Sequence, residues 1–183
     1  MRHISEIIIH CTATRPEWMA GQPGGAKRDE IRRWHLDRGW NDIGYHDLID
    51  RDGSILVGRP INVTGAHCKG HNTGSIGVSL LGGHGSSEDD DFEENFTAEQ
   101  DAALRKYIED RKLTFPSITK ISGHNEYAAK ACPGFRVSEW IGETPIVRTP
   151  EAVQVHHDDP AEAPQGIIAA IMAFIAALFR RKS

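Results

Sequence analysis

The sequence is poor in cysteine and carries no excess of positive charge. Its 183 residues include three cysteines, Cys11, Cys68 and Cys132. An odd number without regular spacing argues against a disulfide scaffold and indicates reduced thiols or metal ligands. The chain has 21 lysines and arginines against 26 aspartates and glutamates, a formal net charge of −5. Because this balance supplies no broad basic face, nucleic acid is not expected as the main partner.

The N-terminus lacks the long apolar run of a secretory signal. Residues 1–6 include charged and polar side chains, and no extended apolar h-region follows them. A Sec-type signal peptide would need such a region. We therefore expect the chain to be made, and first held, in the cytoplasm.

Hydrophobic residues make up 39% of the chain, enough for one ordinary core. Sequence patterns predict strands at residues 5–10, 55–57, 75–80 and 118–121, and helices at 27–38 and from Thr97 onward. The run 75–80 alternates small or polar residues with apolar ones, which predicts a strand with one face in the core. Strands interspersed with helices predict a single α/β domain with a central mixed sheet flanked by helices.

One segment near the C-terminal third, residues 123–134, gathers His124, Lys130 and Cys132 before a closing Pro-Gly. Imidazole and thiolate both suit Zn²⁺, but two ligands do not complete a site. His10 is the best candidate for a third ligand, since it ends an apolar strand and would reach the rim of a sheet. Cys11 should point to the opposite face of that strand, into the core.

Several short motifs accompany these residues in a fixed order: Trp40, Ile43-Gly44-Tyr45-His46, Gly65-Ala66-His67, Ser75-Ile76-Gly77-Val78 and Cys132-Pro133-Gly134. Together with His10, His124 and Lys130, this order resembles the zinc-dependent N-acetylmuramoyl-L-alanine amidases. Within that family the likeness is greatest to the small phage endolysins of amidase type. The resemblance covers residues 4 to 141, roughly.

The resemblance implies one Zn²⁺ per chain, held by His10, His124 and Cys132 with the fourth position open to water. Zinc lowers the pKa of its water to roughly 7 and polarises the scissile carbonyl. By the same resemblance, Tyr45 orients the water or accepts its proton, and Lys130 stabilises the oxyanion. Two further histidines near the expected cleft, His67 and His46, are expected to contact the substrate or surround the ligands.

The implied reaction is hydrolysis of the amide bond between N-acetylmuramic acid and L-alanine in peptidoglycan. A phage endolysin of this kind is made in the host cytoplasm and acts on the wall in the periplasm; we expect a monomer. Two alternatives stay open: a peptidoglycan-binding module without catalysis, and an amidase that recycles soluble muropeptides.

The C-terminal residues differ in composition from the rest. Residues 1–142 form the expected catalytic domain, and residues 143–165, with four prolines and several acidic residues, read as a linker. Residues 166–179 are fourteen consecutive apolar residues followed by Arg180, Arg181 and Lys182. As a helix they would span about 21 Å, short of a bilayer core of about 30 Å. We expect residues 166–183 to engage a membrane; the alternative is a helix docked on the body or on another copy.

Overall fold

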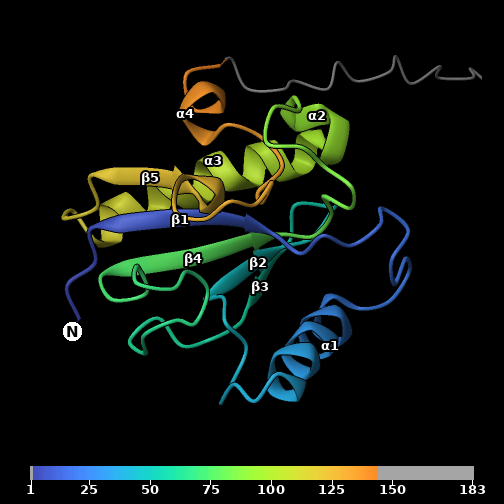
Figure 1. Cartoon of the computed structure of the whole chain (residues 1–183), viewed down its shortest axis with the longest axis horizontal. Coiled ribbons are helices and arrows are strands. Elements are labelled where there is room, and N and C mark those ends of the chain that lie inside the picture. Colours follow the sequence, from blue (N-terminus) through green and yellow to red (C-terminus); the bar gives the residue numbers. More distant parts are fainter. Residues whose placement is uncertain (1, 144–183) are drawn as a thin grey trace, which may run out of the picture. The chain divides into compact units, whose positions relative to one another are not determined.

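The computed structural model describes residues 2–143 and contains one five-stranded sheet in the order β3-β2-β4-β1-β5 (Figure 1). The strands are β1 (Glu6–Cys11), β2 (Asp47–Ile49), β3 (Ile55–Val57), β4 (Ser75–Leu80) and β5 (Lys120–Gly123). β1 runs parallel to both of its neighbours, β4 and β5, and β2 runs parallel to β4. β3 is antiparallel to β2. The predicted α/β architecture with a mixed sheet is confirmed.

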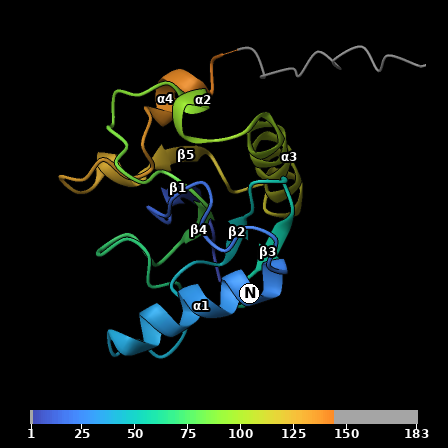
Figure 2. The ribbon, with the colours of Figure 1, turned by 90° about the vertical axis from the view of Figure 1, so that its right-hand side faces the viewer.

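Helices cover both faces of this sheet. They are α1 (Gly24–Asp37), α2 (Phe92–Asn95), α3 (Ala98–Thr114), α4 (Val137–Trp140) and the 3₁₀ turn η1 (His124–Glu126). The two long ones, α1 and α3, lie on opposite sides of the sheet (Figure 2). Within residues 2–143, no helix has the length and apolar character needed to cross a membrane.

The ends of the long helices follow local chemistry. α3 starts after Thr97, whose hydroxyl accepts the Gln100 amide while the Gln100 side chain accepts the Thr97 amide, the predicted capping box. α1 ends before Gly39, which has a φ of 81°, as predicted. Its start was predicted at Lys27 but lies at Gly24, because the Pro23 carbonyl already accepts the amides of the first turn.

The side chains of β1 and β4 divide by face. The face toward α3, here called the apolar face, joins a large hydrophobic cluster through alternate residues of both strands: Ile7, Ile9 and Cys11 of β1, and Ile76, Val78 and Leu80 of β4. The predicted inward position of Cys11 is therefore confirmed. The other face, here called the polar face, carries Glu6, Ile8 and His10 of β1 and Ser75, Gly77 and Ser79 of β4.

The polar face is buried as well, which the alternation in residues 75–80 did not predict. All six residues of β4 are buried. His46 and His67 cover this face: the amide of Gly77 donates to His46 Nδ1 at 3.0 Å, and the His67 ring lies directly against Gly77. Ser75 and Gly77 of β4 thus face buried histidines instead of solvent.

Two strands are shifted relative to their predicted ranges. β1 begins one residue later than predicted and β5 two residues later, because their pairing register aligns Glu6 with Lys120 and Ile9 with Gly123. The turn Ile118 N–H to Phe115 O occupies the residues before β5. The expected linker (143–165), apart from Glu143, and the expected membrane-engaging tail (166–183) lie outside the described residues, and both stay predictions.

Candidate active site

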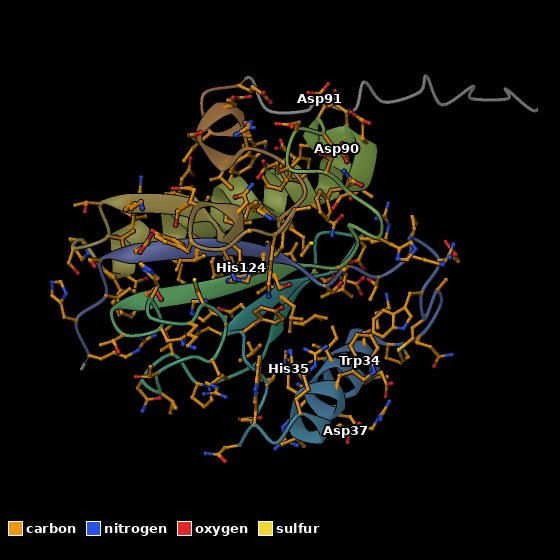
Figure 3. All side chains as sticks on the ribbon, in the orientation of Figure 1. Trp34, His35, Asp37, Asp90, Asp91 and His124 are labelled. Carbon is orange, nitrogen blue, oxygen red and sulfur yellow. The ribbon has the colours of Figure 1, made fainter. Side chains whose placement is uncertain are left out.

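The three residues expected to bind metal converge at one edge of the sheet. His10 is near the carboxyl end of β1, and His124 directly follows β5. Parallel neighbouring strands end at the same edge, so both imidazoles arrive together. Figure 3 labels His124 among the side chains drawn on the ribbon. The loop after η1 adds Cys132, and one ligand atom from each of the three residues lies within 4.8 Å of the others.

The geometry of this group suits a zinc ion. Cys132 Sγ lies 3.8 Å from His10 Nδ1, close to the roughly 3.6 Å that separates nitrogen and sulfur ligands in a tetrahedral zinc site. The His10 and His124 ring centroids are 4.6 Å apart. Two imidazoles and one thiol leave a fourth position free, the arrangement of a catalytic rather than a structural site.

The electrostatics keep both imidazoles neutral. Burial, with the charges of His67, His124 and Lys130, lowers the pKa of His10 well below its ordinary 6.5. Burial and then Lys130 lower the pKa of His124. A neutral imidazole is the form that binds a metal ion.

Cys132 differs from the two histidines in the protonation state that it has in the free protein. Its hydrogen bond with Cys11 and then burial raise the pKa of Cys132, so the free protein holds a protonated thiol that must lose its proton to bind metal. The amide of Cys11 donates to Cys132 Sγ at 3.3 Å. That donor stabilises negative charge on the sulfur once the proton has left.

The two expected catalytic side chains flank this group. The half-buried Tyr45 ring lies 5.2 Å from the His10 ring and 5.3 Å from the His35 ring. Burial, reinforced by Cys132 and Cys11, raises the pKa of Tyr45, which favours a hydroxyl that donates over one that accepts a proton. Lys130 is exposed, and its charge acts on both His10 and His124.

A groove of about 620 Å³ opens beside the three ligands. Its wall includes His124, Lys130, His67, Lys69, Trp40 and Tyr127. Trp40 is 37% exposed and stacks on His35, a residue of α1 labelled in Figure 3, with ring centroids 4.6 Å apart. The groove therefore combines two aromatic rings with two lysines next to the ligand cluster.

The two histidines expected to contact substrate occupy different environments. His67 lines the groove, and its Nδ1 is 3.1 Å from His10 Nε2. His46 is 1% exposed and is not among the residues that line the groove. Its Nδ1 accepts the Gly77 amide, and its Nε2 lies 3.0 Å from the Val63 carbonyl and 2.8 Å from Arg2 Nη2. Its ring also packs against His67, with centroids 5.7 Å apart. Substrate contact stays a prediction for both residues.

Sequence reasoning did not single out several residues of the site. Tyr127 lines the groove and stacks on His71 with ring centroids 3.9 Å apart. Lys69 lines the groove from the loop before β4. Both belong to loops with no periodic pattern, so only their nearness to the Gly65-Ala66-His67 motif and to the 123–134 segment could have suggested them.

Comparisons with known proteins agree with this geometry. Residues 1–135 match the N-acetylmuramoyl-L-alanine amidase family, and the chain belongs to that family. The endolysin of Enterobacteria phage K11 is 39% identical over 137 residues, which cover 75% of this chain and 85% of the relative. The sequence resemblance to amidases of the endolysin type is thereby confirmed.

Solved structures place the same fold in two groups of proteins. The amidase LysC from Clostridium intestinale URNW aligns with a TM-score of 0.60 at 25% identity, covering 76% of this chain and 83% of that one. Bumblebee PGRP-SA, a peptidoglycan recognition protein (PGRP), aligns with a TM-score of 0.62 at 26% identity. The alignment covers 82% of this chain and 87% of that one. The fold is therefore shared by amidases and by PGRPs.

Proposed function

We propose that this chain is a zinc-dependent amidase that cleaves peptidoglycan between the lactyl group of N-acetylmuramic acid and L-alanine, as an endolysin in phage-induced lysis. The observation that carries the proposal is the cluster of His10, His124 and Cys132 beside a groove that also holds Lys130. Membership of the amidase family supports the choice of bond.

The three clustered residues would hold one zinc ion. When bound, zinc supplies a Lewis acid that lowers the pKa of water and polarises a carbonyl. The protein contributes two imidazoles kept neutral by burial and a thiol whose charged form is stabilised by the Cys11 amide. Neighbouring parallel strands bring the two imidazoles together, and the loop after η1 adds the thiol.

Tyr45 and Lys130 would act on the reacting amide. Tyr45 keeps its proton and orients the attacking water through its hydroxyl, from a ring packed against His10 and His35. Lys130 lies at the groove wall beside His124 and places an ammonium where charge grows on the carbonyl oxygen. Lys69, the second lysine of the wall, supplies positive charge for carboxylates of the peptide stem.

The deciding experiment identifies the bond. Purified sacculi are digested with the full chain, and the products are analysed by mass spectrometry. An amidase leaves a free lactyl carboxylate on the glycan and a free amine on L-alanine, whereas a glycosidase would create new reducing ends. Activity should disappear with a chelator and return with added Zn²⁺. Stems that stay attached to the glycan would contradict the proposal.

Binding without cleavage is the second candidate, and the structural similarity to PGRP-SA favours keeping it. It predicts that the chain sediments with sacculi but releases no stem peptides. A muropeptide-recycling amidase would instead cleave soluble fragments and leave intact sacculi untouched. The same two substrates therefore separate all three functions.

A further inference from the structure

A chain of buried polar groups leads away from His10, on the side opposite Cys132. His10 Nε2 lies 3.1 Å from His67 Nδ1, and His67 Nε2 lies 3.4 Å from Ser75 Oγ. Ser75 Oγ in turn lies 2.5 Å from the carbonyl oxygen of His71. The side chains of His10, His67 and Ser75 belong to residues that are 1%, 7% and 1% exposed. Solvent therefore has little opportunity to replace these partners.

The His71 carbonyl, at the end of this series of contacts, fixes the direction of every hydrogen bond in the series. A carbonyl oxygen only accepts, so the Ser75 hydroxyl donates to His71 O, and Ser75 Oγ is left to accept from His67 Nε2–H. A neutral His67 protonated at Nε2 has an unprotonated Nδ1, which accepts from His10 Nε2–H. His10 Nδ1 then keeps its lone pair, on the edge of the ring that faces Cys132 Sγ.

Two glycines make room for the His67 ring. A Cβ on Gly77 would lie 2.4 Å from His67 Cγ, and a Cβ on Gly65 would lie 2.5 Å from His67 Cδ2. Neither glycine has a backbone in the left-handed region, so conformational freedom does not explain them. Gly77 sits inside β4, where glycine weakens a strand and often marks a close approach. The fold therefore holds this ring by removing side chains on both sides of it.

The backbone that carries the ring is fixed independently. The amides of His67 and Cys68 both donate to Asn72 Oδ1, at 2.8 and 2.9 Å. This closes the loop before β4 at Asn72, the residue after His71, whose carbonyl accepts the Ser75 hydroxyl. Ring and loop are thus positioned together, without any contribution from a substrate.

We propose that His67 is a positioning residue for the metal ligand His10: through Ser75, the His71 carbonyl sets the tautomer of both rings so that His10 presents Nδ1 to the metal. The inference rests on the proposed zinc site, and it gives His67 a role separate from substrate contact. Metal-binding histidines commonly donate their second ring N–H to a fixed acceptor, and loss of that acceptor weakens metal binding about 10- to 100-fold.

The first test reads the tautomers directly. Nitrogen-15 NMR of the full chain as purified, at pH 7, should show both His10 and His67 protonated at Nε2 and not at Nδ1. A proton on His10 Nδ1, or on His67 Nδ1, would overturn the inference. This measurement requires no catalytic activity, so it is independent of whether the chain cleaves peptidoglycan.

The second test measures zinc affinity by competition with a chelator. His67→Phe keeps a ring between the two glycines but removes the acceptor, and zinc should bind about 10- to 100-fold more weakly. His67→Asn restores an acceptor near the position of Nδ1 and should recover part of that loss. His84→Phe, at an exposed histidine, is the matched control and should bind zinc like the wild type.

The outcomes separate the two proposals. Unchanged zinc affinity in His67→Phe would overturn the positioning role even if the enzyme cleaves peptidoglycan. A wild-type chain that binds no zinc would instead contradict the proposed function. If His67→Phe failed to fold, the NMR result on the unmodified chain would still decide the inference.

Discussion

On the apolar face of β1 and β4, alternate side chains are aliphatic or a thiol and pack into one cluster with α3. On the polar face, the same two strands carry a glutamate, an isoleucine, a histidine, two serines and a glycine. Both faces are buried. The apolar face stabilises the fold by removing area from water, at about 25 cal/mol per Å². The polar face gains little net stability, about 1 kcal/mol per hydrogen bond, but each of its bonds has a direction.

The residues that stabilise the fold and the residues that orient the site thus lie on opposite faces of the same two strands. A cluster of hydrocarbon tolerates exchange among side chains of similar volume. A buried polar layer does not, because an unpaired group costs about 1–3 kcal/mol and a wrongly oriented one changes what its neighbour can bind. We therefore expect substitutions on the two faces to affect different measurements.

The largest effect is expected for a residue of the proposed metal site. His124→Ala removes one of the three proposed metal ligands from a half-buried position. Amidase activity should become undetectable and tight zinc binding should be lost, while the free energy of unfolding of the metal-free protein changes by less than about 1 kcal/mol. Release of stem peptides and chelator competition measure the first two. Wild-type activity in this variant would remove His124 from the centre.

Ile76→Ala should produce the opposite result on the other face of β4. Ile76 is fully buried in the apolar cluster, and truncation should cost about 3 kcal/mol of stability through lost burial and a cavity. Zinc affinity at 25 °C should stay within about twofold of the wild type, since Ile76 pairs with Ile7, three residues before His10 on β1, and its side chain is on the opposite face. Urea denaturation and chelator competition provide the two readings. A large loss of zinc affinity without destabilisation would break the comparison.

Lys130→Ala extends the comparison to the site itself, where it should separate zinc binding from turnover. Lys130 is exposed and lines the groove beside His124. Zinc should remain bound, but turnover should fall about 10²-fold or more, as for the loss of an oxyanion donor. Steady-state kinetics on purified wall, with zinc content measured in the same sample, test this. Normal turnover would exclude Lys130 from the mechanism; Lys69→Ala is the matched control for loss of positive charge in the groove.

The smallest effect expected per residue is the change of stability with pH that one buried histidine contributes. Burial lowers the pKa of His35 and of His46 from 6.5 to about 4. The unfolded chain therefore binds more protons between these values, and the folded state loses stability as pH falls below 6.5. Each group should cost about 2 kcal/mol at pH 5. Urea denaturation of the chelator-treated protein at pH 7 and pH 5 measures the sum over all histidines whose pKa burial lowers. This sum includes His67, whose pKa burial lowers to about 3, and the metal-free His10 and His124, whose pKa values are also lowered.

Ile76→Ala provides the control for that measurement as well. Its loss of stability comes from hydrocarbon and should be the same at both pH values, so its curve should run parallel to that of the wild type. Equal wild-type stability at pH 7 and pH 5 would show that the buried histidines do not resist protonation.

Much of the fold and the core of the site could be predicted from local patterns. The capping box at Thr97 and Gln100 and the glycine after α1 both act through neighbours within a few residues. His10 was recognisable because an apolar strand delivers it to a sheet edge. The burial of the second face of β4 was missed, since Ser75, Gly77 and Ser79 look the same whether they face water or a layer of histidines.

The sequence by itself predicted four of the strands, the two long helices, the family and the three candidate donors, because these depend on apolar periodicity, residue type and the order of short motifs. Only the tertiary structure decided which atoms meet: the contact of His10 with His67, the Ser75 hydroxyl aimed at the His71 carbonyl, and the room left by Gly65 and Gly77. Such contacts join residues of β1, of β4 and of the loop between β3 and β4. Their geometry depends on pairing register and loop closure, which no local pattern encodes.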